Sequence, residues 1–72
     1  MVLLKIKDQR KAEDYCVKNI GRMLYYIHNA RGGEGWAIKG QGLESVLTID
    51  DDKKALMAAL ILSEEIYEAE RR

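Results

Sequence analysis

Residues 49–71 read IDDDKKALMAALILSEEIYEAER, and this stretch carries the strongest structural signal in the chain. Thr48, followed three residues later by Asp51, fits the N-cap pattern in which both side chains accept hydrogen bonds from free backbone N–H groups. The aspartates at 50–52 lie where a helix dipole is positive, and Arg71 lies where it is negative. These signals predict a helix over about residues 49–71.

The apolar positions of this predicted helix cover more than half of its circumference. At about 100° per residue, Leu56 and Leu60 lie on one strip. Ala59, Leu62 and Ile66 lie on a second strip beside it. One partner helix buries a stripe only slightly wider than ~100°, and exposed apolar patches of larger extent usually mark an interface. The sequence therefore predicts that these five residues form an oligomer interface.

A second helical pattern lies earlier in the chain, from about residue 8 to residue 30. Its apolar residues recur at three- and four-residue steps, the spacing of one helix face. They are Ala12, Cys16, Ile20, Met23, Leu24 and Ile27. The pair Gly32–Gly33 supplies a stop signal, because glycine readily takes the left-handed conformation that ends helices.

A glycine-rich connection over residues 31–47 joins the two predicted helices. Two antiparallel helices need fewer residues to connect them, so this segment is longer than the geometry demands. Residues 36–39 and 45–49 flank the turn Gly40-Gln41-Gly42 and fit a short β-hairpin. A single helical turn at residues 43–47 is the alternative interpretation.

These patterns together predict a mainly α protein, with two long antiparallel helices at about 8–30 and 49–71 in one small domain spanning residues 1–72. Residues 2–7 are left open as a strand or as an extension of the first helix. A chain of 72 residues buries only roughly 60% of its unfolded surface, so a further source of stability is expected. One cysteine and one histidine exclude an intramolecular disulfide and a Cys/His zinc site within one chain. We therefore expect a homodimer that forms a four-helix bundle.

The side chains that could support catalysis or bind a metal are poorly placed for either. Cys16 and His28 lie twelve residues apart, roughly 18 Å along one helix, whereas a nucleophile and its base need contact at about 3 Å. Glu64 and Glu68 share a helix face but lack the Glu-x-x-His spacing of di-metal bundles. The aspartates at 50–52 lack the ligand spacing of a calcium loop. We expect no catalytic residue, no metal and no cofactor, and hence no enzyme.

A protein partner is expected to bind near the end of the first predicted helix. Tyr25, Tyr26, Arg31 and Trp36 have the composition of a binding hot spot, which is rich in tryptophan, tyrosine and arginine. The leading hypothesis is a non-enzymatic protein–protein interaction or regulatory module that acts as a homo-oligomer. The alternative for Trp36 is that it covers the open end of the helix pair.

Nucleic-acid or nucleotide binding is the alternative function. Lys11, Lys18 and Arg22 fall in one stripe of the first predicted helix, and Arg31 and Lys39 follow in the connection. Cations for phosphates beside aromatic rings for bases are what such a ligand requires. Residues 1–40 carry eight Lys/Arg and four Asp/Glu, and residues 41–72 carry the reverse. The basic stripe is thus also explained by charge complementarity within the oligomer or toward an acidic protein partner.

No membrane segment is expected. The longest apolar run, residues 55–62, has eight residues, whereas a bilayer span needs roughly 18 or more. Residues 2–6 are too short and too charged for a signal-peptide core. A lone thiol without an export signal is typical of a reducing compartment, so we expect a cytoplasmic protein.

Overall fold

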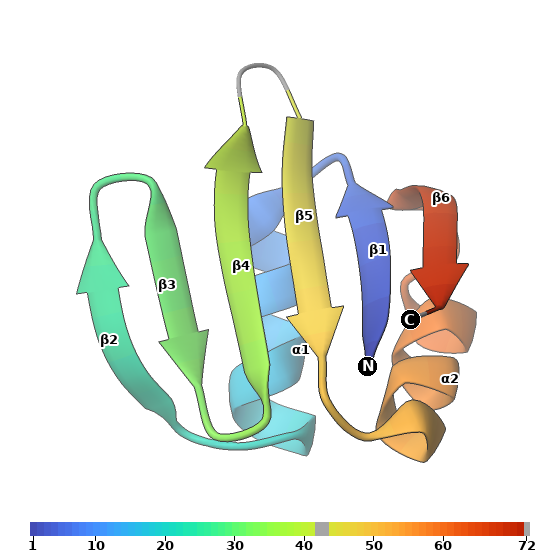
Figure 1. Cartoon of the computed structure of the whole chain (residues 1–72), viewed down its shortest axis with the longest axis horizontal. Helices are drawn as coiled ribbons and strands as arrows, with labels where there is room; N and C mark the ends of the chain where they lie inside the picture. Colours follow the sequence, from blue (N-terminus) through green and yellow to red (C-terminus); the bar gives the residue numbers. More distant parts are fainter. Residues whose placement is uncertain (42–43, 72) are drawn as a thin grey trace.

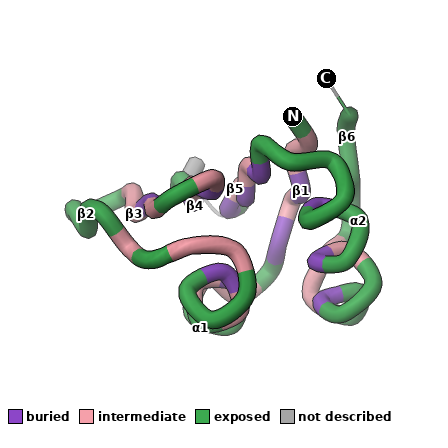
Figure 2. Tube along the Cα trace, turned by 90° about the horizontal axis from the view of Figure 1, so that it is seen from below, coloured by how far each residue is buried: buried purple, intermediate pink, exposed green. Residues whose placement is uncertain are grey.

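A six-stranded antiparallel sheet with both helices on one of its faces forms the fold (Figure 1 and Figure 2). The structure is a computed structural model that describes residues 1–41 and 44–71. The elements follow one another as β1 (Val2–Ile6), α1 (Gln9–Asn19), β2 (Met23–Ile27), β3 (Ala30–Gly33), β4 (Trp36–Gln41), β5 (Glu44–Ile49), α2 (Asp52–Ile61) and β6 (Ile66–Arg71).

The strand order across the sheet is β2-β3-β4-β5-β1-β6, so the first strand of the chain lies inside the sheet between β5 and β6. Leu4 of β1 lies opposite Leu47 of β5 on one side and Ala69 of β6 on the other. Ile38 of β4 continues the same row. Residues directly opposite one another share a face of the sheet, and this row faces the helices.

The core lies between the sheet and the two helices. Packing contacts place α1 against β4 and place α2 against β1 and β5. Each helix turns small buried residues toward the sheet, Ala12 and Cys16 from α1 and Ala55 and Ala58 from α2, which lets helix and sheet approach closely. The buried apolar residues are Leu4, Ile6, Ala12, Cys16, Trp36, Ile38, Leu47, Ile49, Ala55, Ala58 and Leu62.

The prediction of a mainly α four-helix bundle is wrong. In each of the two predicted long helices, only the first part is helical, and most of the second part belongs to the sheet. α1 ends at Asn19 with Ile20 as its C-cap. Gly21 follows the C-cap, and an added Cβ there would collide with the carbonyl oxygen of Glu34, so glycine is needed at this close approach. Residues 23–27 then pair with β3, and their aromatic and β-branched side chains favour a strand.

The second predicted helix is also shorter than expected. Asp51 is the N-cap, and its carboxylate accepts hydrogen bonds from the backbone N–H groups of Lys53 at 2.8 Å and Lys54 at 3.0 Å. Thr48, the predicted cap, lies inside β5. α2 ends at Ile61, and the chain turns into β6, which pairs with β1. Glu68, Ala69 and Glu70 favour a helix, so here the pairing of β6 with β1 overrides the local propensity.

The predicted hairpin is confirmed, because β4 and β5 pair along their whole length. Of the predicted turn Gly40-Gln41-Gly42, Gly40 and Gln41 belong to β4 and residue 42 lies outside the described residues. The alternative of a helical turn at 43–47 is wrong for residues 44–47, which belong to β5, and residues 2–6 form a strand. Gly32 and Gly33 do not stop a helix but lie in β3. At Gly33 an added Cβ would collide with the carbonyl oxygen of Arg22 and the indole of Trp36.

Candidate interaction surface

The outward side of α2 presents large aliphatic side chains to solvent. Positions 56, 57, 60 and 61 share one side of a helix because they are separated by steps of one, three and four residues. Their exposed fractions are 63% for Leu56, 53% for Met57, 65% for Leu60 and 59% for Ile61. We call these four residues the α2 ridge. The helix therefore turns its alanines inward and its larger apolar residues outward.

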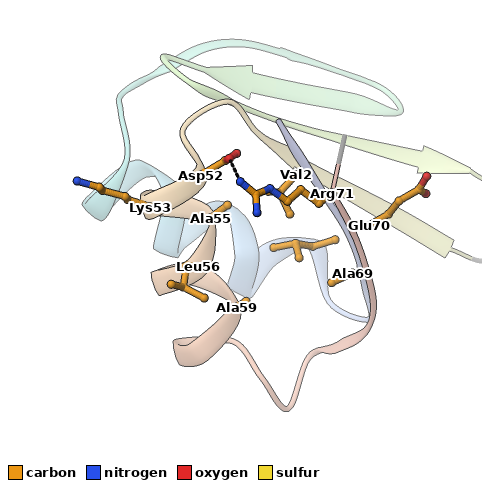
Figure 3. A pocket seen from close by; sticks show the side chains of 10 residues that line it. Val2, Asp52, Lys53, Ala55, Leu56, Ala59, Ala69, Glu70 and Arg71 are labelled. Atoms are coloured by element: carbon orange, nitrogen blue, oxygen red, sulfur yellow. Dashed lines mark hydrogen bonds and ion pairs between the residues drawn. The ribbon is translucent and has the colours of Figure 1, made fainter.

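An apolar hollow lies between the α2 ridge and the edge of the sheet. Figure 3 shows Ala55, Leu56 and Ala59 along α2, with Val2 of β1 and Ala69 of β6 across from them. The hollow has a volume of about 410 Å³. Three of its ten lining residues are alanines, Ala55 and Ala59 on the α2 wall and Ala69 on the sheet wall, and their small side chains leave space between the walls. We call it the alanine hollow.

An ion pair lies at one end of the alanine hollow and joins α2 to β6. The guanidinium of Arg71 donates to the carboxylate of Asp52 at 2.8 Å, and the N-terminal amine lies 3.3 Å from the same carboxylate (Figure 3). The hydrogen bond from Arg71, followed by that from the N-terminal amine, lowers the pKa of Asp52 below its ordinary value. The carboxylate thus remains charged where it meets two cations.

A second, smaller hollow of about 290 Å³ lies on the other side of the ridge, between α1 and α2. Tyr15 and Ile20 form its wall on the α1 side, and Met57 and Ile61 form its wall on the α2 side. The α2 ridge therefore stands between two hollows. Such relief gives a protein partner both a projecting edge and places to insert side chains.

The five predicted interface residues divide between this surface and the core. Leu56 and Leu60 lie on the α2 ridge, and Ala59 lines the alanine hollow. Leu62 is only 8% exposed, and Ile66 is partly buried against the core. Leu62 and Ile66 therefore lie outside the α2 ridge, which instead contains Met57 and Ile61, two exposed residues that the sequence analysis missed. The signal that could have found them is the alternation of alanine and larger residues over 55–61.

Trp36 is not the exposed anchor that a hot spot requires. It is 3% exposed, and its Nε1 donates a hydrogen bond to the carbonyl oxygen of Gly21 at 2.7 Å. The indole therefore fastens the end of α1 to β4, and the hot-spot interpretation of Trp36 is wrong. The alternative interpretation, that Trp36 covers a helix end, is closer to what is observed, because its indole bonds to Gly21 just after α1.

The remaining predicted partner-binding residues lie together near the β2–β3 turn. Tyr25 and Tyr26 are exposed on β2, which forms one edge of the sheet. The guanidinium of Arg31 lies 4.4 Å from the centre of the Tyr26 ring. The same guanidinium forms an ion pair with Glu13 of α1 at 3.1 Å, and both side chains are largely buried. Arg31 thus links β3 to α1 through its ion pair with Glu13, and its guanidinium stacks on the ring of Tyr26.

The predicted basic stripe is dispersed and mostly neutralised. Three of its cations form ion pairs, Lys11 with Glu65 at 3.2 Å, Lys18 with Asp14 at 3.1 Å and Arg22 with Glu34 at 3.1 Å. The hydrogen bond to Glu65 raises the pKa of Lys11 above its ordinary value. Lys39 lies opposite Ala30 and Val46, on the sheet face that the helices do not cover. These side chains do not form one surface for a phosphate backbone.

The lone thiol is inaccessible to a substrate. Cys16 is fully buried, and burial raises the pKa of its thiol to about 12. Reactive cysteines need a thiolate and partial exposure, and Cys16 has neither at neutral pH. His28 lies at the β2–β3 turn. Over residues 1–41 and 44–71, His, Cys, Asp and Glu form no group of three that could hold a metal ion.

Comparison of the chain with protein-family models, curated proteins and solved structures found no match. Within the part of the chain that the structure describes, neither helix has the length and hydropathy to cross a membrane.

Proposed function

We propose that this chain is a non-enzymatic protein–protein interaction module that self-associates through the α2 ridge. The observation that carries this proposal is the arrangement of α2, which buries Ala55 and Ala58 and leaves Leu56, Met57, Leu60 and Ile61 mostly in water. In an isolated chain this arrangement buries less apolar surface than the reverse one would, so it contributes less to the free energy of unfolding. The loss is recovered when a partner covers the ridge.

The energies are of the right size for reversible association. At its present exposure, each ridge side chain gains roughly 1–2 kcal/mol on burial. Two copies together contribute eight such side chains. Their combined gain is of the same order as the cost of association, roughly 4–15 kcal/mol. The ridge therefore supports a modest, concentration-dependent affinity.

A second copy of the chain fits this surface because knob and hollow lie side by side on it. In a two-fold dimer, the residue that inserts and the residue that receives belong to the same surface patch on each copy. Leu60 of one copy is placed to enter the alanine hollow of the other, beside Ala59 and Leu56. The exchange is repeated by symmetry.

Charges at the two ends of the ridge favour an antiparallel approach of the two α2 helices. Lys53 lies four residues before Met57 and is exposed, and Glu64 follows the other end of the helix and is exposed. Of the three aspartates that precede Lys53, Asp51 is engaged in the N-cap and Asp52 with Arg71. An antiparallel pairing therefore brings Lys53 of each copy toward Glu64 of the other.

Molar mass measured over a range of concentrations tests the proposal. The double variant Leu56→Glu/Leu60→Glu places charge on the ridge, so it is expected to remain folded by circular dichroism and to sediment with the mass of one chain. Val17→Glu is the matched control, because Val17 is an exposed apolar residue of α1, and it is expected to dimerise like the wild type. A wild-type chain that stays single at every concentration would rule out self-association.

Charge exchange tests the antiparallel arrangement separately. Lys53→Glu or Glu64→Lys alone places like charges together across the dimer and is expected to weaken it. The double variant restores opposite charges and is expected to recover most of the affinity. Two single variants with no effect on affinity would contradict the antiparallel pairing.

The single buried thiol is consistent with a reducing compartment such as the cytoplasm, and we propose that setting for the module. Nucleic-acid binding gains no support from the surface, because three of the five cations in question face carboxylates of the same chain and a fourth, Arg31, is paired with Glu13.

A further inference from the structure

The two edges of the sheet differ in how they are protected. β6, at one edge, carries Glu68, Glu70 and Arg71. β2, at the other edge, reads MLYYI and carries no charge. Proteins usually guard a free strand edge with charges, proline or a covering element, because its backbone groups readily pair with another strand. β2 has no charge, no proline and no covering element (Figure 1), and its pairing with β3 shifts register between Met23 and Tyr25. We call residues 23–27 the β2 edge.

The side chains of the β2 edge are presented to solvent on both faces of the sheet. Leu24, Tyr26 and Ile27 are each about three-fifths exposed, and Tyr25 is 46% exposed. In Figure 2 the strand extends beyond α1, with no helix beneath it. An arriving strand would therefore find apolar and aromatic neighbours on either face.

The tyrosines of this edge are held in place from inside the molecule. Tyr25 lies over Gly32 of β3, where an added Cβ would be 2.5 Å from the ring carbon Cε1. Tyr26 lies on the helix side, stacked on the guanidinium of Arg31. Because the rings are fixed in advance, binding costs less conformational entropy. Both tyrosines of the β2 edge thus contact β3, although the outer side of β2 pairs with no strand among the described residues.

A polar hollow of about 510 Å³ opens beside Tyr26 on the helix side of the sheet. Two of its carboxylates are engaged: Asp8 accepts the backbone N–H groups of Arg10 and Lys11 as the α1 N-cap, and Glu13 pairs with Arg31. Lys7 and Arg10 also line this hollow, and among the described residues neither forms an ion pair. We call it the Tyr26 hollow. Its lining holds three cations and two carboxylates, so its net charge is positive by one.

We infer that the β2 edge binds an extended, acidic segment of a partner protein by strand addition. The backbone of the segment pairs with β2, and its apolar residues lie beside Tyr25 and Ile27. Its alternate side chains, which point to the helix side, are carboxylates that meet Lys7 and Arg10 in the Tyr26 hollow. Backbone hydrogen bonds supply affinity in this mode of recognition, and alternate side chains supply specificity.

The strands of a second copy of the chain match the charge of the β2 edge less well than an acidic segment does. Its β2 has no carboxylate to offer. Its β6, if it continued the sheet antiparallel to β2, would place Arg71 on the helix side, because Arg71 pairs with Val2 and shares its face. Cations would then face cations. A partner of different sequence, with an acidic strand, fits both the shape and the charge of the edge.

Fluorescence anisotropy with short labelled peptides tests the inference on the full chain. The probe is an end-blocked peptide of sequence Ser-Val-Glu-Val-Glu-Val-Ser, in which the glutamates share one side of a strand. It is expected to bind, and the same peptide with lysine in place of glutamate is expected to bind roughly five- to tenfold more weakly. Methylating the peptide nitrogens of the probe removes its backbone donors and is expected to abolish binding.

A charge-reversing variant tests whether the glutamates of the bound peptide lie near Arg10. Arg10→Glu adds a negative charge to the first turn of α1, where the helix dipole favours it, so the fold is expected to be retained. It is expected to reverse the preference, with the lysine peptide binding more tightly than the glutamate peptide. Lys18→Glu, at the far end of α1, is the matched control and is expected to leave the preference unchanged.

The outcomes separate this inference from the proposed self-association. The Leu56→Glu/Leu60→Glu variant, whether or not the wild type dimerises, is expected to bind the acidic peptide like the wild type. Absence of peptide binding, equal binding of the two peptides, or binding that survives backbone methylation would each overturn strand addition of an acidic segment. So would Arg10→Glu having no effect on the preference.

Discussion

The two helices lie on the same face of the sheet, yet their outward sides are opposite in character. Both begin at an aspartate N-cap, and both turn small residues toward the sheet. The outward side of α1 carries charged residues such as Lys11, Asp14 and Lys18, whereas α2 carries the aliphatic α2 ridge. Since α1 shows that a charged outer side is compatible with this fold, the aliphatic side of α2 is not required for folding. The proposed self-association rests on this difference between the two helices.

The largest expected change in stability is at Trp36, whose hydrogen bond to Gly21 holds the segment after α1 against β4. Trp36→Ala removes a buried ring and its hydrogen bond to Gly21, so the free energy of unfolding is expected to fall by about 3–5 kcal/mol. Leu56→Ala, on the α2 ridge, is expected to change it by less than about 0.5 kcal/mol in the single chain. Urea denaturation at a concentration where the chain is single measures both. Equal losses would show that the ridge also supports the fold.

The two sides of α2 itself provide the next test. Ala58 is fully buried against the core, so Ala58→Leu overfills the space and is expected to lower the free energy of unfolding by about 1–3 kcal/mol. Met57→Leu, on the next residue but on the outward side, is expected to have almost no effect. If the two variants were equally stable in thermal or urea unfolding, α2 would not be oriented as described.

The smallest expected effect is a pH-dependent loss of stability that comes from Cys16, on the buried side of α1. Because burial raises the pKa of Cys16 to about 12 from an ordinary 9.0, the folded chain keeps a proton that the unfolded chain loses above pH 9. Stability is therefore full below pH 9 and decreases as pH rises toward 12, by about 1.4 kcal/mol at pH 10. Subtracting the stability of Cys16→Ala cancels the other titrating groups. A difference that stays constant from pH 8 to pH 11 would mean that water reaches the thiol.

Local signals in the sequence were sufficient for some elements. The aspartates before α2, the three- and four-residue steps of Ala12, Cys16 and Ile20, and the hairpin at 36–49 all correspond to observed structure. Each depends on interactions between residues close in sequence, such as a cap, one helix face or a tight turn. Such interactions operate wherever the rest of the chain lies.

The segment at 23–27 was predicted wrongly because a short apolar run fits two periodicities, and the segment at 66–71 because its glutamates and alanine favour a helix. Residues such as Met23, Leu24 and Ile27 are spaced for a helix face, but five consecutive uncharged residues also fit a strand. The choice was made by pairing, of β2 with β3 and of β6 with β1. β6 and β1 lie more than sixty residues apart in sequence, so no local pattern reveals their contact.

By itself, the sequence determined that residues 55–61 carry more apolar surface than one helix contact can cover, whereas its placing of Cys16 and His28 on one helix is wrong, because His28 lies at the β2–β3 turn. Only the tertiary structure decided which apolar residues are left outside. Leu62 and Trp36 are buried, whereas Met57 and Tyr26 are exposed. The physical reason is that a helix wheel records the angle between side chains, whereas burial depends on where the sheet lies relative to the helix.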